Sequence, residues 1–230
     1  MPRPKYIRNQ KEFMGHSIKE KYTYDKSQLR QIIEAMDYYH AESKKDTVSD
    51  YVVFDVTLRV KDTRLSPYYE PLDYDDCSGE FFDVNSMKEV FPDDYFFYRW
   101  TREWSEKNQE HYHFMVIANH VPKQGYLQQL HQNILELTGV KTAFISPRLL
   151  ADDDHRGKLH FHWLNKEPDD ADGLNDAVNR HSYKSKMDQK LEGVKRTFDG
   201  CRVLKPLLPL SKRLHSLSVA AEKKQTAVGA

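Results

Sequence analysis

The strongest constraint on the fold is a pair of apolar-rich segments, 95–104 and 111–118, which are joined by the polar stretch 105–109. Runs of this length and composition predict strands, and the short polar connection between them is typical of an antiparallel hairpin. The sequence therefore predicts that these two segments lie side by side in one sheet.

The expected pairing of this hairpin brings four polar side chains together. A symmetric register sets Glu103 opposite His111 and Thr101 opposite His113. Because directly opposed residues of an antiparallel pair point the same way, all four would share one face of the sheet. A slip of one residue would turn Glu103 to the other face and break up the group.

Glu103, His111 and His113 are candidate ligands of a divalent metal ion. Residues two apart in a strand project from the same face, so both imidazoles can reach one ion. One carboxylate with two neutral imidazoles suits Mg²⁺ or Mn²⁺ and leaves coordination positions open for phosphate oxygens. Asp55 is the alternative third ligand, because it lies on the polar face of a second predicted strand, 52–60.

A candidate nucleophile lies much later, in the sequence Tyr183-Lys184-Ser185-Lys186. Tyrosine is a weak nucleophile until its hydroxyl proton leaves, and a nearby ammonium group stabilises the phenolate. A helix is predicted over 172–190, in which Tyr183 and Lys186 are neighbours and Lys190 continues the same side. A metal ion and an activated tyrosine together indicate phosphodiester chemistry.

The remaining hydrophobic pattern predicts an α+β fold with an antiparallel sheet and helices on one face. Further helices are expected over 26–39 and 125–137, and further strands near 142–146 and 158–164. The segment 62–94 is rich in Pro, Asp, Tyr and Ser and predicts a long surface excursion or insertion.

With these motifs the chain resembles the HUH endonucleases, and more narrowly the replication initiators of inovirus-type phages and related prophages. The matching segments are Trp100-Thr101-Arg102-Glu103, the strand from His111-Tyr112-His113 to Asn119, Tyr183-Lys184-Ser185-Lys186 and the Asp55 strand. The similarity covers residues 50 to 202 and is dense only around these motifs. The segment 196–202 resembles the family imperfectly, with Cys201 at a position where serine is expected.

The resemblance implies a ferredoxin-like, split βαβ palm and a metal-dependent endonuclease. Such an enzyme nicks one DNA strand at an origin, forms a covalent 5′-phosphotyrosine bond through Tyr183, and starts rolling-circle replication. Its partners would be single-stranded or origin DNA and the replication helicase and polymerase of a bacterial host. A partner helicase is expected because the chain contains no phosphate-binding loop of the Gly-x-x-x-x-Gly-Lys-Ser/Thr type.

Charge along the chain fits a polyanionic partner, although 35 basic and 35 acidic residues balance overall. Residues 1–30 hold eight Lys/Arg against three Asp/Glu, and residues 184–230 hold eleven against four, so the centre is acidic. Basic ends around a metal-binding centre would grip the flanks of a nucleic acid. Solvated surface charge explains the same pattern without any partner.

The predicted organisation is a basic N-terminal arm (1–24), an endonuclease-like domain (25–204) and a basic tail (205–230). Without an apolar run of about 18 residues or a secretory signal, the chain is expected in the cytoplasm, away from membranes. Cys77 and Cys201 form no CxxC pair, so neither a disulfide nor a cysteine metal site is expected.

Other interpretations of the same residues remain open. His160-Phe161-His162 has the same alternation as the first histidine pair and predicts sheet-face residues near the site, or part of a zinc site that uses both pairs. Glu103 could instead pair with a neighbouring arginine on the surface. In function, the alternatives are a non-catalytic DNA-binding regulator on the same fold and a nuclease that uses water as its nucleophile.

Overall fold

The computed structural model describes residues 5–45, 49–61, 82–105, 109–120, 122, 124–145, 161–187 and 198–211. This part of the chain combines a mainly antiparallel sheet with helices, as the sequence predicts for an α+β protein. The helices are α1 (Lys26–Lys45), α2 (Met87–Val90), α3 (Gln124–Leu135) and α4 (Leu174–His181), with 3₁₀ turns η2 (Val84–Ser86) and η4 (Ser182–Ser185). The strands are β1 (Tyr6–Ile7), β2 (Glu12–Phe13), β3 (His16–Ser17), β4 (Tyr24–Asp25), β5 (Tyr51–Val60), β6 (Phe96–Ser105), β7 (Gln109–Asn119), β8 (Val140–Ile145), β9 (His162–Trp163) and β10 (Phe198–Gly200).

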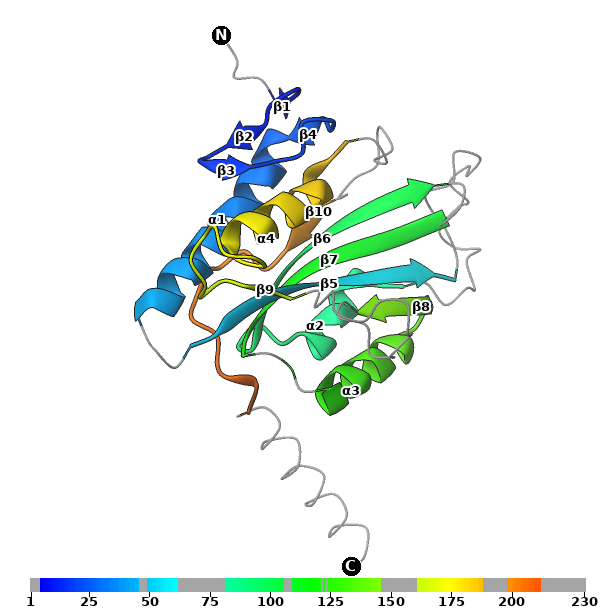
Figure 1. Ribbon diagram of the computed structural model, residues 1–230. Helices are drawn as coiled ribbons and strands as arrows, with labels where there is room; N and C mark the ends of the chain where they lie inside the picture. The colour runs from blue at the N-terminus through cyan, green and yellow to red at the C-terminus, as the bar shows by residue number, and fades with distance from the viewer. Residues whose placement is uncertain are drawn as a thin grey trace, which may run out of the picture.

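The main sheet has the strand order β10-β6-β7-β5-β8, with β9 also paired to β5 (Figure 1). Every neighbouring pair in it is antiparallel. Strand β7 lies between β5 and β6, and β5 in turn lies between β7 and β8. The two crossover connections, one containing α2 and the other α3, are therefore interleaved across the sheet.

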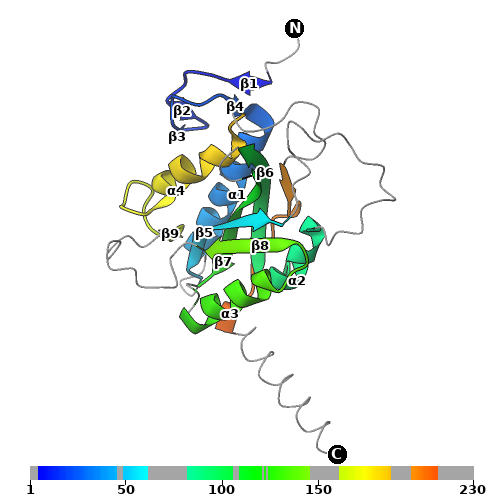
Figure 2. The same cartoon turned by 90° about the vertical axis from the view of Figure 1, so that its right-hand side faces the viewer.

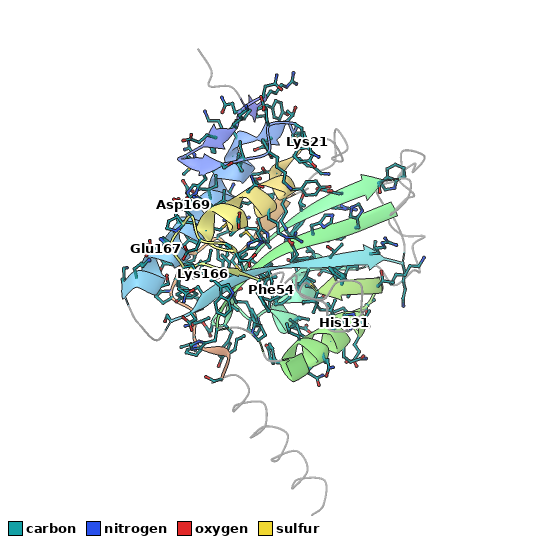
Figure 3. The ribbon with its side chains drawn as sticks, viewed as in Figure 1. Lys21, Phe54, His131, Lys166, Glu167 and Asp169 are labelled. Carbon is teal, nitrogen blue, oxygen red and sulfur yellow. The ribbon has the colours of Figure 1, made fainter. Side chains whose placement is uncertain are left out.

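Alternation along β5 creates the two sides of this sheet. Its even-numbered residues, among them Phe54 (labelled in Figure 3), belong to a core shared with α2 and α3. Val53, an odd-numbered residue, belongs to a second core shared with α1 and α4. Two residues further on, the odd-numbered positions become Asp55 and Thr57, so the second side changes from apolar to polar along the same strand.

The prediction of helices on one face is wrong, because helices cover parts of both (Figures 1 and 2). The physical reason is that the side bearing Val53 also carries Phe97, Met115 and Ile117, all fully or almost fully buried. These apolar groups need cover, which α1 and α4 supply. Only the polar half of this side remains for a functional site.

The predicted strands of the hairpin are confirmed as β6 and β7, and the predicted helices 26–39 and 125–137 as α1 and α3. The last helix is shorter than predicted: α4 ends at His181 and the chain continues as the 3₁₀ turn η4. Ser182 and Ser185 donate side-chain hydrogen bonds to backbone carbonyls of Asn179 and Ser182. Such bonds compete with regular helix and favour a tighter turn.

The segments predicted as an N-terminal arm, an insertion and a C-terminal tail each contain residues that contact the rest of the fold. Residues 5–25 form two small two-stranded sheets, and the Met187 amide donates to the Thr23 carbonyl. In the predicted excursion, Met87 and Phe91 are fully buried in the core shared with α2 and α3, whereas residues 62–81 lie outside the described part. Beyond residue 204, Leu207 and Leu210 are also buried.

Cys201 is a free thiol, as expected, and Cys77 lies outside the described residues. Among the described helices, none combines the length and the apolar character that crossing a bilayer requires.

We predict that Gly200→Ala weakens the attachment of β10. Gly200 has a φ of +143°, and an added Cβ would lie 2.3 Å from the Tyr98 carbonyl oxygen. The free energy of unfolding, measured by urea denaturation, should fall by about 1–3 kcal/mol. Gly125→Ala is the matched control: a Cβ on this α3 residue meets nothing within 4 Å, and removing a helical glycine should stabilise by about 0.5–1 kcal/mol. Equal effects of the two substitutions would contradict this account of Gly200.

Candidate functional site

The β6–β7 register brings the predicted metal ligands together. Glu103 pairs with His111, and Thr101 pairs with His113, as the symmetric hairpin predicts. Glu103 is completely buried and His111 almost so, whereas the side chain of His113 keeps 24% of its exposure. The polar half of the sheet therefore holds a buried carboxylate with two imidazoles, one of which reaches solvent.

The distances in this group fit a shared cation better than direct hydrogen bonds. Glu103 Oε2 lies 3.8 Å from His111 Nε2 and 3.7 Å from His113 Nε2. Hydrogen bonds between such atoms are roughly 2.7–3.2 Å long. Two ligands that each lie about 2.1 Å from one ion can be up to about 4.2 Å apart. Both distances from Glu103 fall within this limit, and the ligand atoms of Glu103, His111 and His113 all lie within 4.8 Å of one another, so a small adjustment of the imidazoles would let the group hold a metal ion.

Thr57 on β5 orients one of the two imidazoles. Its hydroxyl lies 3.0 Å from His113 Nδ1, on the ring side away from Glu103. Burial, with the nearby charge of Lys184 next in size, lowers the pKa of His113 to about 3. This imidazole is therefore neutral at physiological pH, the state in which a histidine binds metal.

Tyr183 and Lys186 meet beside the candidate metal group, although not on one α-helix as predicted. Tyr183 lies in η4, and Lys186 is the extended residue that follows the turn. Side chains three apart in a 3₁₀ turn eclipse each other, and the Lys186 ammonium donates to the Tyr183 hydroxyl. The same ammonium lies 4.0 Å from Glu103 Oε2, and the Tyr183 ring centroid lies 6.2 Å from that of His113.

Asp55 does not join the metal group but anchors the tyrosine segment to the sheet. Its carboxylate accepts hydrogen bonds from Lys184 and from Arg180, the latter at 2.7 Å, and lies 3.3 Å from His181 Nδ1. All three partners belong to α4 or η4. Burial alone would raise the pKa of Asp55, but Lys184, His181 and Arg180 together hold it well below its usual range. Asp55 is therefore ionised and pairs with the residues on either side of Tyr183.

The second histidine pair is described only in part. His162 on β9 is buried, and its ring centroid lies 5.8 Å from that of His181, so it neighbours the Asp55 cluster rather than the metal group. Its position on the sheet agrees with the interpretation of a sheet-face residue. His160 and Lys190 lie outside the described residues.

Sequence reasoning missed several groups around the site. Thr57 carried a usable signal, because it follows Asp55 on the polar face of β5. His181 and Arg180 carried a weaker one, as basic residues just before Tyr183. Tyr22 carried none: it comes from the predicted N-terminal arm, yet its ring lies 5.4 Å from that of Tyr183 in an edge contact.

Comparisons with known proteins give no independent assignment: no protein-family model, no curated protein and no solved structure matches this chain. The site must therefore be interpreted from its own geometry.

We predict that Mn²⁺ raises the melting temperature of the wild-type protein through this group. A ligand that binds only the folded state stabilises it by about 2.7 kcal/mol at a concentration of 100 Kd. Differential scanning fluorimetry after treatment with EDTA should show a shift in the wild type and none in Glu103→Gln or His113→Asn. His162→Asn is the control, because this buried histidine lies outside the metal group, and its shift should persist. A shift of wild-type size in Glu103→Gln would rule out the assigned ligands.

We also predict that the metal-free protein loses stability as the pH falls below about 6.5. Burial is the main cause that lowers the pKa of both His162 and His181 below the ordinary value of 6.5. The unfolded chain then binds more protons than the folded one, so the free energy of unfolding decreases on acidification. Because the pKa of Asp55 is also lowered, protonation of this carboxylate in the unfolded chain further decreases the free energy of unfolding near pH 3.8 and below.

Urea denaturation in EDTA at several pH values between 5 and 7.5 measures this slope. Each histidine that stays neutral in the folded protein lowers the free energy of unfolding by up to about 1.4 kcal/mol for each pH unit of acidification. His162→Gln should flatten the curve relative to the wild type. An unchanged slope in that variant would show that His162 takes up its proton in the folded state.

Proposed function

We propose that this protein is a metal-dependent endonuclease that nicks and rejoins single-stranded DNA through a covalent tyrosine intermediate. The observation that carries the proposal is the position of Tyr183, with its hydroxyl held by Lys186, next to the group of Glu103, His111 and His113. Lys186 contacts the candidate nucleophile Tyr183 and lies 4.0 Å from Glu103 Oε2, so it places the tyrosine hydroxyl beside the candidate metal group.

Each side chain has a defined role in this reaction. Lys186 holds the Tyr183 oxygen and stabilises the negative charge that remains when the hydroxyl proton leaves. The tyrosine oxygen then attacks phosphorus, forming a Tyr–O–P bond while the bond from phosphorus to the 3′ oxygen breaks, and the 3′ oxygen takes up a proton. A bound Mg²⁺ or Mn²⁺ would polarise the phosphate and neutralise charge in the transition state. Because the diester energy is kept in the phosphotyrosine, the 3′ hydroxyl can reverse the step and join the strand.

The fold supports the same proposal. In the order β8-β5-β7-β6, two β-crossover-β units interleave, a pattern that supports a split βαβ, ferredoxin-like palm. The helices of those two crossovers, α2 and α3, contribute to the same core, on the side away from the candidate site. We infer an HUH-type palm in which the His111-Tyr112-His113 strand is central and the tyrosine segment lies across its polar face.

The biological reaction that suits this chemistry is the initiation of rolling-circle replication, in which one strand is opened, kept covalently attached and later rejoined. The DNA substrate would be single-stranded at the site, because His113 and Tyr183 are only partly exposed on the polar face and a single flexible strand can reach them more easily than a duplex. Helicase and polymerase activities would come from partner proteins of a bacterial cell.

The decisive test incubates full-length protein with a random single-stranded DNA pool and Mn²⁺, followed by denaturing gels and peptide mass spectrometry. The wild type should give a denaturant-resistant adduct on Tyr183, and Tyr183→Phe should give none. Lys186→Met should reduce the rate of adduct formation by about 10²–10³-fold, because a charge-stabilising donor is lost. Tyr6→Phe, on an exposed tyrosine of β1, is the control and should react as the wild type does.

Other outcomes assign the protein differently. Cleavage without an adduct, retained in Tyr183→Phe, would indicate water as the nucleophile. Tight DNA binding with neither cleavage nor adduct would indicate a regulator that has lost the reaction.

A further inference from the structure

A cavity of about 480 Å³ lies on the same side of the sheet as the metal group, towards the β10 edge. Its walls come from α1, β6, β10 and the residues after β10: Gln31, Glu34, Arg99, Phe198, Asp199, Arg202 and Leu204. Small-molecule sites in proteins have volumes of roughly 300–1,000 Å³. None of the candidate metal ligands lines this space, so it is separate from the reaction centre.

Strand register fixes the direction from the metal group to this cavity. Phe198 pairs with Thr101, and Thr101 pairs with His113, so the three residues form one row across the sheet. Opposed residues point to the same face, which places Phe198 on the side of His113. Two strand spacings separate them, about 10 Å. In the next row Gly200 pairs with Arg99, so Arg99 lies on the same face as Thr101, one row further along the sheet.

Arg99 is the polar group that the cavity leaves incompletely satisfied. Only 8% of this residue is exposed, and among the described residues its buried Nε has no hydrogen-bond partner. The guanidinium carbon lies 5.5 Å from the Phe97 ring centroid and 5.9 Å from that of Phe198. A buried guanidinium N–H without an acceptor is costly, so a ligand that supplies an oxygen or nitrogen acceptor to the Arg99 Nε would be stabilised here.

The other walls favour a base over a phosphate. Arg202 lies at the rim, with its Nη2 3.6 Å from Asp199 Oδ2, and Glu34 is an exposed residue of α1. Two carboxylates would repel an anion, whereas they accept hydrogen bonds from the amino groups of a base. Phe198 adds an aromatic ring on which a base can stack.

We propose that this cavity binds one unstacked base of the DNA strand whose phosphate reacts at Tyr183, with guanine as the best match. Guanine presents O6 and N7 as acceptors, which an arginine can contact together. Its amino group can donate a hydrogen bond to a carboxylate oxygen. The identity of the ligand as part of a DNA strand rests on the proposed function. The chemistry of the cavity does not depend on the metal or on the tyrosine, and this independence allows a separate test.

The test titrates ¹⁵N-labelled full-length protein, in EDTA, with deoxyguanosine monophosphate and follows the amide signals of Phe198 and Gly200 by NMR. The three other deoxynucleoside monophosphates and inorganic phosphate are titrated in parallel. We expect saturable shifts with the guanine nucleotide, weaker ones with the other bases, and none with phosphate. Arg99→Met should weaken guanine binding by about tenfold or more, because paired contacts to one base contribute about 1–3 kcal/mol.

Two further variants keep the result interpretable. Phe198→Ala removes the stacking ring at a partly exposed position and should weaken binding of every base, even if Arg99→Met fails to fold. Lys141→Met on β8, at the opposite edge of the sheet, removes one exposed positive charge and should leave binding unchanged.

Equal shifts with phosphate alone, unchanged binding in Arg99→Met and Phe198→Ala, or no shift at the highest soluble nucleotide concentration would each overturn the proposal. If guanine binds but no adduct forms, the nicking reaction is rejected and the assignment of the base site remains valid. An adduct on Tyr183 without nucleotide binding at Phe198 and Gly200 would do the reverse.

Discussion

The antiparallel register of β6 and β7 is the constraint on which the site depends. With Glu103 opposite His111 and Thr101 opposite His113, one buried carboxylate faces two imidazoles. Because side chains alternate along a strand, a shift of one residue would place Glu103 in the apolar core on the other side. The same shift would expose part of that core, so burial of Trp100, Phe114 and their neighbours fixes the register that the metal group needs.

Two buried pairings of an acidic residue with a lysine then hold the tyrosine segment on the sheet. Asp55 contacts Lys184, and Glu103 lies 4.0 Å from Lys186. The two lysines are two apart in sequence, on either side of Ser185, and both are almost completely buried. Breaking a buried pair of this kind by removing one partner is strongly destabilising, because the other charge remains without compensation. Tyr183, which directly precedes these lysines, is thus held at the sheet by charges that belong to β5 and β6.

Helices on both faces also explain why the site lies at one end of the sheet. On the site's side, α1 and α4 cover the apolar half formed by residues such as Val53 and Ile117. The polar half is covered differently: Glu103 is buried beside the Lys186 ammonium, since a carboxylate buried under apolar side chains alone would carry a large desolvation cost. The segment between β3 and β4 and the turn η4 contribute tyrosine rings to this half, with Tyr22 against Tyr183.

Sequence patterns were sufficient for the local parts of this arrangement. Alternation identified β5 and the β6–β7 hairpin, helical spacing identified α1 and α3, and the length of the polar link gave the register that joins Glu103 to His111. These features depend on neighbours in sequence or on one tight connection, where hydrophobic period and turn geometry decide the outcome. The 3₁₀ turn at Tyr183 was not predicted, because the serine hydrogen bonds that favour it compete closely with helix continuation.

What the sequence by itself indicated is a candidate metal group of His111 and His113 with Glu103 or Asp55, and the pairing of Tyr183 with a lysine three residues later. Only the tertiary structure decided that Asp55 anchors Lys184 instead of joining the candidate metal group, that Tyr22 lies against Tyr183, and that Arg99 and Phe198 line a cavity. Each of these contacts joins segments that are far apart in sequence, up to 161 positions in the case of Tyr22 and Tyr183. No local periodicity encodes such contacts, because they arise when separate elements bury their apolar faces and charges find partners in the space that remains.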